Sequence, residues 1–253
     1  MKRAWSVLAV LVLLAAVAPF LAPYAPDAID LANRREGPAA AHWFGTDDLG
    51  RDVFSRVLYG GRVSIAIGLL AALVAAGLGV AVGAVAGYVG GWIDTVLMRG
   101  TDAMLSIPRL LLLMVAAATL QPSVPALVLL VGVVGWMETA RVTRTAVRTI
   151  ATQEFVLASL AAGAGHVRIV WRHLLANAAG AIRTAAVMAV GRAILVESAL
   201  SFFGVGVQPP DASWGSMLYQ AQAAMSTEPW LALFPGACIV VTVGTLNALS
   251  DRA

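Results

Sequence analysis

Lysine is nearly absent from this sequence, and so are the residue patterns of several kinds of enzyme. Lys2 is the only lysine, so the phosphate-binding pattern GxxxxGK[ST] cannot occur. The patterns HExxH and GxSxG are missing as well. We therefore exclude ATP hydrolysis through a P-loop, and we expect a chain that is not an enzyme and uses no cofactor.

Cysteine and histidine are also scarce. The single cysteine, Cys238, lies in an apolar run, which excludes a disulfide framework or a thiolate metal cluster and favours a buried core thiol. The three histidines are His42, His166 and His173. Their spacing is not that of a metal site, although His166 and His173, seven residues apart, could share one face of a helix. We predict no metal site.

Charged residues are scarce as well. Charged residues make up 12% of the 253 residues and hydrophobic residues 60%, with a mean hydropathy of +0.83. A soluble domain has about 25% charged residues. This composition therefore predicts a protein that crosses a membrane several times.

Long apolar runs are what the sequence has in abundance, and no strand periodicity accompanies them. About 20 apolar residues cross the core of a bilayer, and six stretches reach roughly this length: 4–22, 63–90, 103–120, 124–147, 178–204 and 229–249. We therefore predict an all-α polytopic membrane protein with about six transmembrane helices. A cleaved signal peptide is the alternative for the first stretch, but its length and the five further spans favour a retained anchor.

The distribution of arginine predicts the orientation. Between residues 141 and 183 there are six arginines and a single acidic residue, Glu154, which is typical of a cytoplasmic segment. With a cytoplasmic N-terminus, segments 91–102 and 148–177 face inward, and segments 23–62 and 206–228 face outward. We expect both termini to be cytoplasmic.

The second span contains three glycines at intervals of four residues, Gly79, Gly83 and Gly87. This spacing places them on one helical face, where small residues let two helix backbones approach closely. The partner could be another helix of this chain, which we favour, or a second membrane subunit.

Four polar motifs interrupt the apolar runs, and together they resemble a known family. They are GTDDLGRDVFSR at 45–56, GWIDTVLMRGTDAMLSIP at 91–108, EFVLASLAAGAGHVRIVWRHLL at 154–175 and ALSFFGVGVQPPDASWGSML at 199–218. In this order they resemble permease subunits of bacterial ATP-driven importers of the peptide and nickel family. The resemblance implies an N-terminal membrane anchor and outward-facing segment at 1–62 and a permease domain at 63–253.

The resemblance also implies a cytoplasmic coupling helix between the fourth and fifth spans. The family pattern of EAA, three residues and glycine falls on Leu157, Ala158, Ser159 and Gly163, and its closing part reaches Leu175. FVLASLAA can form a short helix, which Gly163 can end by adopting a positive φ. The family's first glutamate is replaced by Leu157, and Glu154, one turn earlier, is the candidate substitute.

The family further implies the partners of the chain. They are a homologous second permease subunit, two cytoplasmic ATPase subunits and an extracytoplasmic substrate-binding protein, assembled in the inner (plasma) membrane without nucleic acid. The chain stops at NALSDRA, where family members continue with a short tail, so either the C-terminal contact of the family is missing here or the sequence is cut.

The sequence constrains the cargo less than it constrains the family. The segments YAPDAIDL, AHWFGTD and EFVLASLAAGAGHVR look most like nickel-importer permeases, so chelated nickel is the first hypothesis and di- or oligopeptides are the alternative. An ATP-independent channel or an intramembrane enzyme is the alternative of another class. Glu197 lies inside a span, where ionisable groups are expensive, so we expect either an ion pair with Arg192 or another arginine, or a place in the transport pathway.

Overall fold

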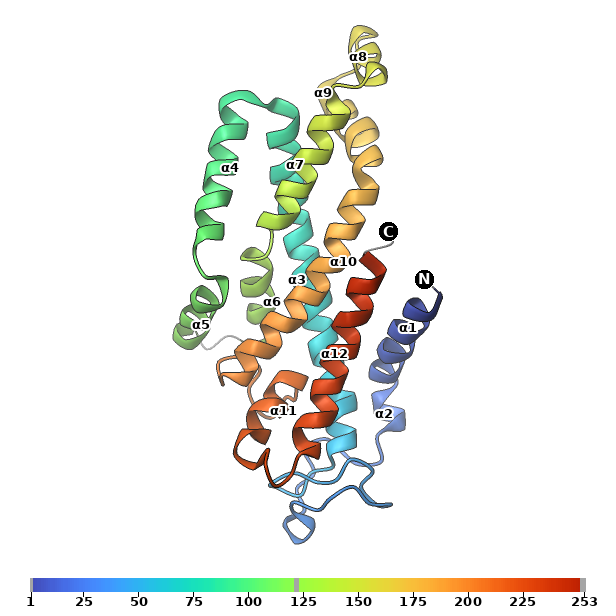
Figure 1. Ribbon diagram of the computed structural model, residues 1–253, viewed down its shortest axis with the longest axis vertical. Helices are drawn as coiled ribbons and strands as arrows, with labels where there is room; N and C mark the ends of the chain where they lie inside the picture. Colours follow the sequence, from blue (N-terminus) through green and yellow to red (C-terminus); the bar gives the residue numbers. More distant parts are fainter. Residues whose placement is uncertain (1, 121–122, 251–253) are drawn as a thin grey trace.

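The computed structural model describes residues 2–120 and 123–250, and it is built from helices (Figure 1). Three helical stretches are long and apolar enough to cross a bilayer: α3 (Val53–Val89), the continuous stretch His166–Phe202 and α12 (Trp230–Ser250). The number rises to five if each of two bent helix pairs counts as one span. The prediction of an all-α membrane protein is therefore confirmed.

The first predicted span, 4–22, is divided into two helices. These are α1 (Lys2–Ala16) and α2 (Ala18–Leu21). The apolar part of α1, Ala4–Ala16, is about 20 Å long, which is shorter than the roughly 30 Å hydrocarbon core of a bilayer. The first predicted span is thus an apolar helix that is too short to cross the bilayer by itself. α1 packs beside α12 and α3.

The second predicted span, 63–90, begins ten residues after the start of the helix in the structure. Helix α3 starts at Val53 because the carboxylate of Asp52 caps it, accepting a hydrogen bond of 2.8 Å from the backbone N–H of Ser55. With 37 residues, α3 is about 55 Å long, so it extends beyond the bilayer core. The division of the chain at residues 62 and 63 stays a prediction.

The third predicted span, 103–120, and the inward loop predicted at 91–102 are both redrawn by the structure. Helix α4 (Gly91–Ser106) already starts at Gly91, and α5 (Arg109–Leu120) follows at 77°. The bend lies at Pro108, which supplies no backbone N–H and keeps Ile107 extended, with ψ 128°. The segment is therefore a broken helix rather than a loop followed by a span.

The fourth predicted span, 124–147, is also broken. It consists of α6 (Val124–Val133) and α7 (Met137–Ala151), which meet at 44°. The break includes Gly135, and α7 then continues to Ala151, past the predicted end.

The remaining elements form the two ends of the bundle and the last spans. At one end α8 (Glu154–Ala161) leads into α9 (His166–Arg168), the π-helical segment η2 (Ile169–Leu175) and α10 (Ala176–Phe202). At the other end lie η1 (Leu31–Asn33), α11 (Trp214–Ala221) and η3 (Gln222–Ala224), before α12. α8 and α11 are thus at opposite ends of the long axis (Figure 1).

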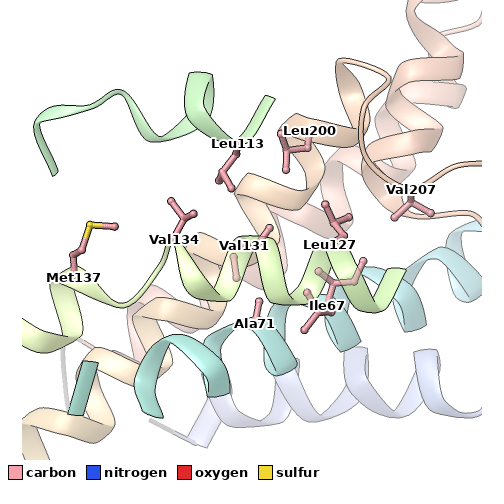
Figure 2. Packing of buried hydrophobic residues seen from close by; sticks show 11 residues of the cluster. Ile67, Ala71, Leu113, Leu127, Val131, Val134, Met137, Leu200 and Val207 are labelled. Atoms are coloured by element: carbon pink, nitrogen blue, oxygen red, sulfur yellow. The ribbon is translucent and has the colours of Figure 1, made fainter. Parts of the chain in front are cut away.

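The largest apolar cluster holds the broken helices against α3 and α10 (Figure 2). Leu127 and Val131 of α6 lie between Ile67 of α3 and Leu113 of α5, and Leu200 of α10 closes the cluster. Four of these five side chains are fully buried and Leu127 is 1% exposed. The core therefore fixes α5 and α6 despite their interruptions.

Polar contacts close the end of the molecule that contains α11. The Arg56 guanidinium donates to the side-chain oxygen of Gln220 at 3.0 Å and to the carbonyl of Pro26 at 3.1 Å. His42 and the capping Asp52 lie 2.9 Å apart. The segment before α3 is thereby attached to both α3 and α11.

Candidate functional site

A short helix forms at the segment that the sequence predicts as a coupling helix, and it projects from the bundle. α8 spans Glu154–Ala161 and lies beyond the ends of α7 and α10 in Figure 1. The helix is short because Gln153 before it is extended, with ψ 148°, and a turn follows it directly. Its position at one end of the molecule makes it accessible to a partner outside the membrane.

Gly163 ends α8 as the sequence predicted, with φ +83°. Its N–H donates to the carbonyl of Leu160 at 2.9 Å, and the N–H of Ala164 donates to the carbonyl of Ser159 at 3.0 Å. These two bonds form a Schellman motif, which favours glycine because the residue must be left-handed. The turn therefore sets a defined angle between α8 and the segment that leads into α10.

The structure gathers most of the predicted coupling residues on this helix and turn. Glu154, Leu157 and Ala158 are exposed, with Leu157 54% exposed, and Ser159 is half-buried. Leu175 lies apart, half-buried at the end of η2. Because Ala176 stands where the family pattern has proline, the helix continues without a break from His166 to Phe202.

Val156 attaches α8 to the bundle. Its side chain is fully buried and packs in a cluster with Val147 of α7 and with Ile169 and Leu174 of η2. At the same end the hydroxyl of Tyr88 on α3 is hydrogen-bonded to the Nδ1 atom of His166. α8 is therefore connected to α7 and η2, and the segment after it is connected to α3, so a displacement of α8 can reach three spanning segments.

Ion pairs between α4 and α7 stiffen the same half of the molecule. The buried carboxylate of Asp94 accepts two hydrogen bonds of 2.5 Å from the Arg144 guanidinium, and Arg148 approaches it to 3.3 Å. Asp102, about two turns further along α4, pairs with Arg141 of α7. Two arginine-paired carboxylates thus hold α4 along α7.

The glycines of α3 pack within this chain. A Cβ atom on Gly79 would lie 2.6 Å from Thr139 Cβ, one on Gly83 would lie 2.4 Å from the Ala140 carbonyl oxygen, and one on Gly87 would lie 2.7 Å from the Arg144 carbonyl oxygen. All three contacts are with α7. In this structure the three glycines therefore pack within the chain, as the favoured alternative predicts.

Glu197 lies in the interior, and among the residues that the structure describes no arginine forms an ion pair with it. Its carboxylate is fully buried and accepts hydrogen bonds from the hydroxyl groups of Ser64 at 3.1 Å and Ser201 at 2.8 Å. Arg192 instead pairs with Glu138 of α7 at 2.8 Å. The expected pair with Arg192 was wrong because residues five apart on a helix point about 140° away from each other. A place for Glu197 in the pathway stays a prediction.

Sequence reasoning missed the residues that support these features. Val156 and Tyr88 lie in runs where almost every residue is apolar, so no periodicity shows which of them face inward. The sequence did indicate that Asp94 and Arg144 need partners, since ionisable residues near a span are costly when unpaired. It did not show that they pair with each other, because that depends on where α4 begins.

Comparisons with known proteins support the resemblance to a permease family. Residues 79–253 match the model of the family described as "binding-protein-dependent transport system inner membrane component". Residues 5–38 match the model described as "N-terminal TM domain of oligopeptide transport permease C".

Individual relatives cover nearly the whole chain. The dipeptide transport system permease protein DppC of Alkalihalophilus pseudofirmus is 37% identical over 95% of this chain and 79% of its own length. The oligopeptide permease OppC of Bacillus subtilis is 36% identical over 97% and 80%. The glutathione transport system permease protein GsiD of Shigella flexneri is 39% identical over 95% and 80%. The chain therefore belongs to the family of inner-membrane components of binding-protein-dependent transport systems, and it is a transport subunit rather than an enzyme.

Proposed function

We propose that this chain forms half of the translocation pathway of an ATP-driven importer of short peptides. The observation that supports the cargo is the agreement among similar permeases, whose names specify dipeptides, oligopeptides and glutathione. Nickel, the first hypothesis from the sequence, has no support from these relatives. The segments that suggested nickel lie in the outer segment and around α8, so we interpret that likeness as kinship rather than cargo.

The importer contains further subunits. A binding-protein-dependent system implies an external binding protein and ATPase subunits, and we propose two ATPases and a homologous second permease. We place the chain in the inner membrane with α8 on the cytoplasmic side, in agreement with the arginines around it.

We propose α8 as the element that docks on an ATPase subunit. The helix exposes Phe155 and Leu157, which are 40% and 54% exposed, while Val156 between them is fully buried. A short helix with one buried anchor and exposed apolar neighbours suits insertion into a groove of a partner. Closure of the ATPases would then displace α8, and the bundle would change between two arrangements.

Uptake in the source organism tests this proposal. Cells with and without the gene are supplied with a labelled dipeptide, and their nickel content is measured by elemental analysis. We expect peptide uptake to fall and nickel content to remain unchanged when the gene is absent. A fall in nickel content with peptide uptake intact would overturn the proposed cargo.

A further inference from the structure

Two broken spans meet at one cavity. The bend between α4 and α5 lies at Pro108, and the break between α6 and α7 includes Gly135. Residues from both breaks line a cavity of about 270 Å³, among them Pro108, Arg109, Gly135 and Glu138. Interrupted helices within a membrane bundle are typical surroundings of substrate sites in transporters.

Arg109, the first residue of α5, brings a positive charge to this cavity. Its Nε atom is buried and, among the residues that the structure describes, has no hydrogen-bond partner. The guanidinium passes close to Gly135, since a Cβ atom there would lie 3.1 Å from its Nη2 atom. A larger residue at position 135 would therefore displace this guanidinium.

The neighbouring charges compensate Arg109 only in part. Glu138 lies on the wall of the cavity, but its carboxylate forms a 2.8 Å ion pair with Arg192 of α10. The three side chains therefore carry two positive charges and one negative charge. An arginine inside a membrane bundle is costly unless an anion or other partner accompanies it, so the excess charge favours an anionic ligand.

We propose that this cavity binds the C-terminal carboxylate of the peptide cargo during passage, with Arg109 as its direct ligand. This inference rests on the proposed function. A guanidinium suits the task because its planar donors match a carboxylate.

The test uses the complete transporter in proteoliposomes, with its second permease, ATPases and binding protein. ATP-dependent uptake is measured for a labelled tripeptide with a free carboxylate and for its C-terminal amide. The ratio of the two uptake rates is then compared between the wild-type chain and Arg109→Gln. Because the same binding protein serves both, its own preference cancels in this comparison.

We expect Arg109→Gln to lower uptake of the free acid about tenfold more than uptake of the amide, the size of a lost charge-assisted hydrogen bond. Arg109→Lys should restore part of the ratio. Arg99→Gln is the matched control, because Arg99 is an exposed arginine of α4 outside the cavity lining, and its ratio should equal that of the wild type.

Equal losses for the two peptides, or no loss, would overturn the carboxylate site. If Arg109→Gln fails to assemble with the ATPases, Gly135→Ala provides the second variant, and it should raise the KM of the free acid more than that of the amide. Absence of uptake of either peptide by the wild-type transporter would instead overturn the proposed function. The two failures are thus distinguishable.

Discussion

At the scale of single residues, the carboxyl group of Glu197 shows how an ionisable group is accommodated inside a span. Within the described part of the chain its partners are serine hydroxyl groups, of which those of Ser64 and Ser201 give its shortest hydrogen bonds. The Ser64 Oγ atom also accepts the N–H of Trp214, at the start of α11. One carboxylate therefore connects α3, α10 and α11.

Loss of this carboxylate should destabilise the protein. We predict that Glu197→Ala lowers the free energy of unfolding by about 1–3 kcal/mol, since it leaves buried hydroxyl groups without their acceptor. Glu197→Gln keeps one acceptor oxygen and should cost less. The thermal unfolding of the purified protein in detergent measures both changes, and an alanine variant as stable as the wild type would contradict this account.

The glycines of α3 allow a prediction with an internal control. Gly83→Ala would place a Cβ atom 2.4 Å from the Ala140 carbonyl oxygen, whereas one on Gly77 would meet nothing within 4 Å. We therefore expect Gly83→Ala to lower the Tm by several degrees. Gly77→Ala should be neutral or should stabilise α3 by up to about 1 kcal/mol, the difference in helix propensity. Equal effects at the two positions would show that α3 does not pack closely on α7.

At the scale of elements, α8 and its turn depend on the left-handed conformation of Gly163. A side chain with a Cβ atom is disfavoured there by roughly 1–2 kcal/mol, and a β-branched one is worse. We predict that Gly163→Val lowers peptide uptake far more than it lowers the amount of protein in the membrane. Gly165→Ala is the control, because Gly165 has φ −67° and open space around it. Unchanged uptake in Gly163→Val would contradict the coupling role of α8.

The ion pairs between α4 and α7 supply a second prediction about elements. Asp94 is 8% exposed and bound by Arg144, whereas Asp102, also paired with α7, is 52% exposed. Buried pairs leave an uncompensated charge when one partner is removed, while exposed pairs contribute about 0–1 kcal/mol. We expect Asp94→Ala to lower the Tm clearly and Asp102→Ala to have little effect in the same melting experiment. A larger loss of Tm in Asp102→Ala than in Asp94→Ala would contradict the geometry of these ion pairs.

The sequence predicted the elements better than their ends. The apolar runs located the helices, and the family pattern located α8 and Gly163. The start of α3 was missed because the capping Asp52 lies in a polar segment that resembles a loop. The start of α4 was missed because Asp94 and its neighbours interrupt the apolar run, although their arginine partners on α7 make them compatible with a helix.

At the scale of the whole molecule, the two ends of the bundle differ in the side chains that they present. α8 exposes apolar side chains at one end, and the segment before α3 is held in place at the other by Arg56 and Gln220. These two ends suit an ATPase on one side and a binding protein on the other. The sequence could predict these partners from its motifs, but not the cavity at Arg109, because that cavity depends on two breaks meeting in space.

The measurement that tests the central claim most directly is the uptake of a labelled dipeptide by proteoliposomes that contain this chain with its partner subunits. We predict that the peptide accumulates inside the proteoliposomes. Accumulation should require ATP on the inner side, where the ATPases face, and the binding protein on the outer side. Accumulation should disappear in Gly163→Val while the complex remains assembled. Equilibration of the peptide without ATP, or with this chain alone, would contradict the account and identify a channel instead of an ATP-driven importer.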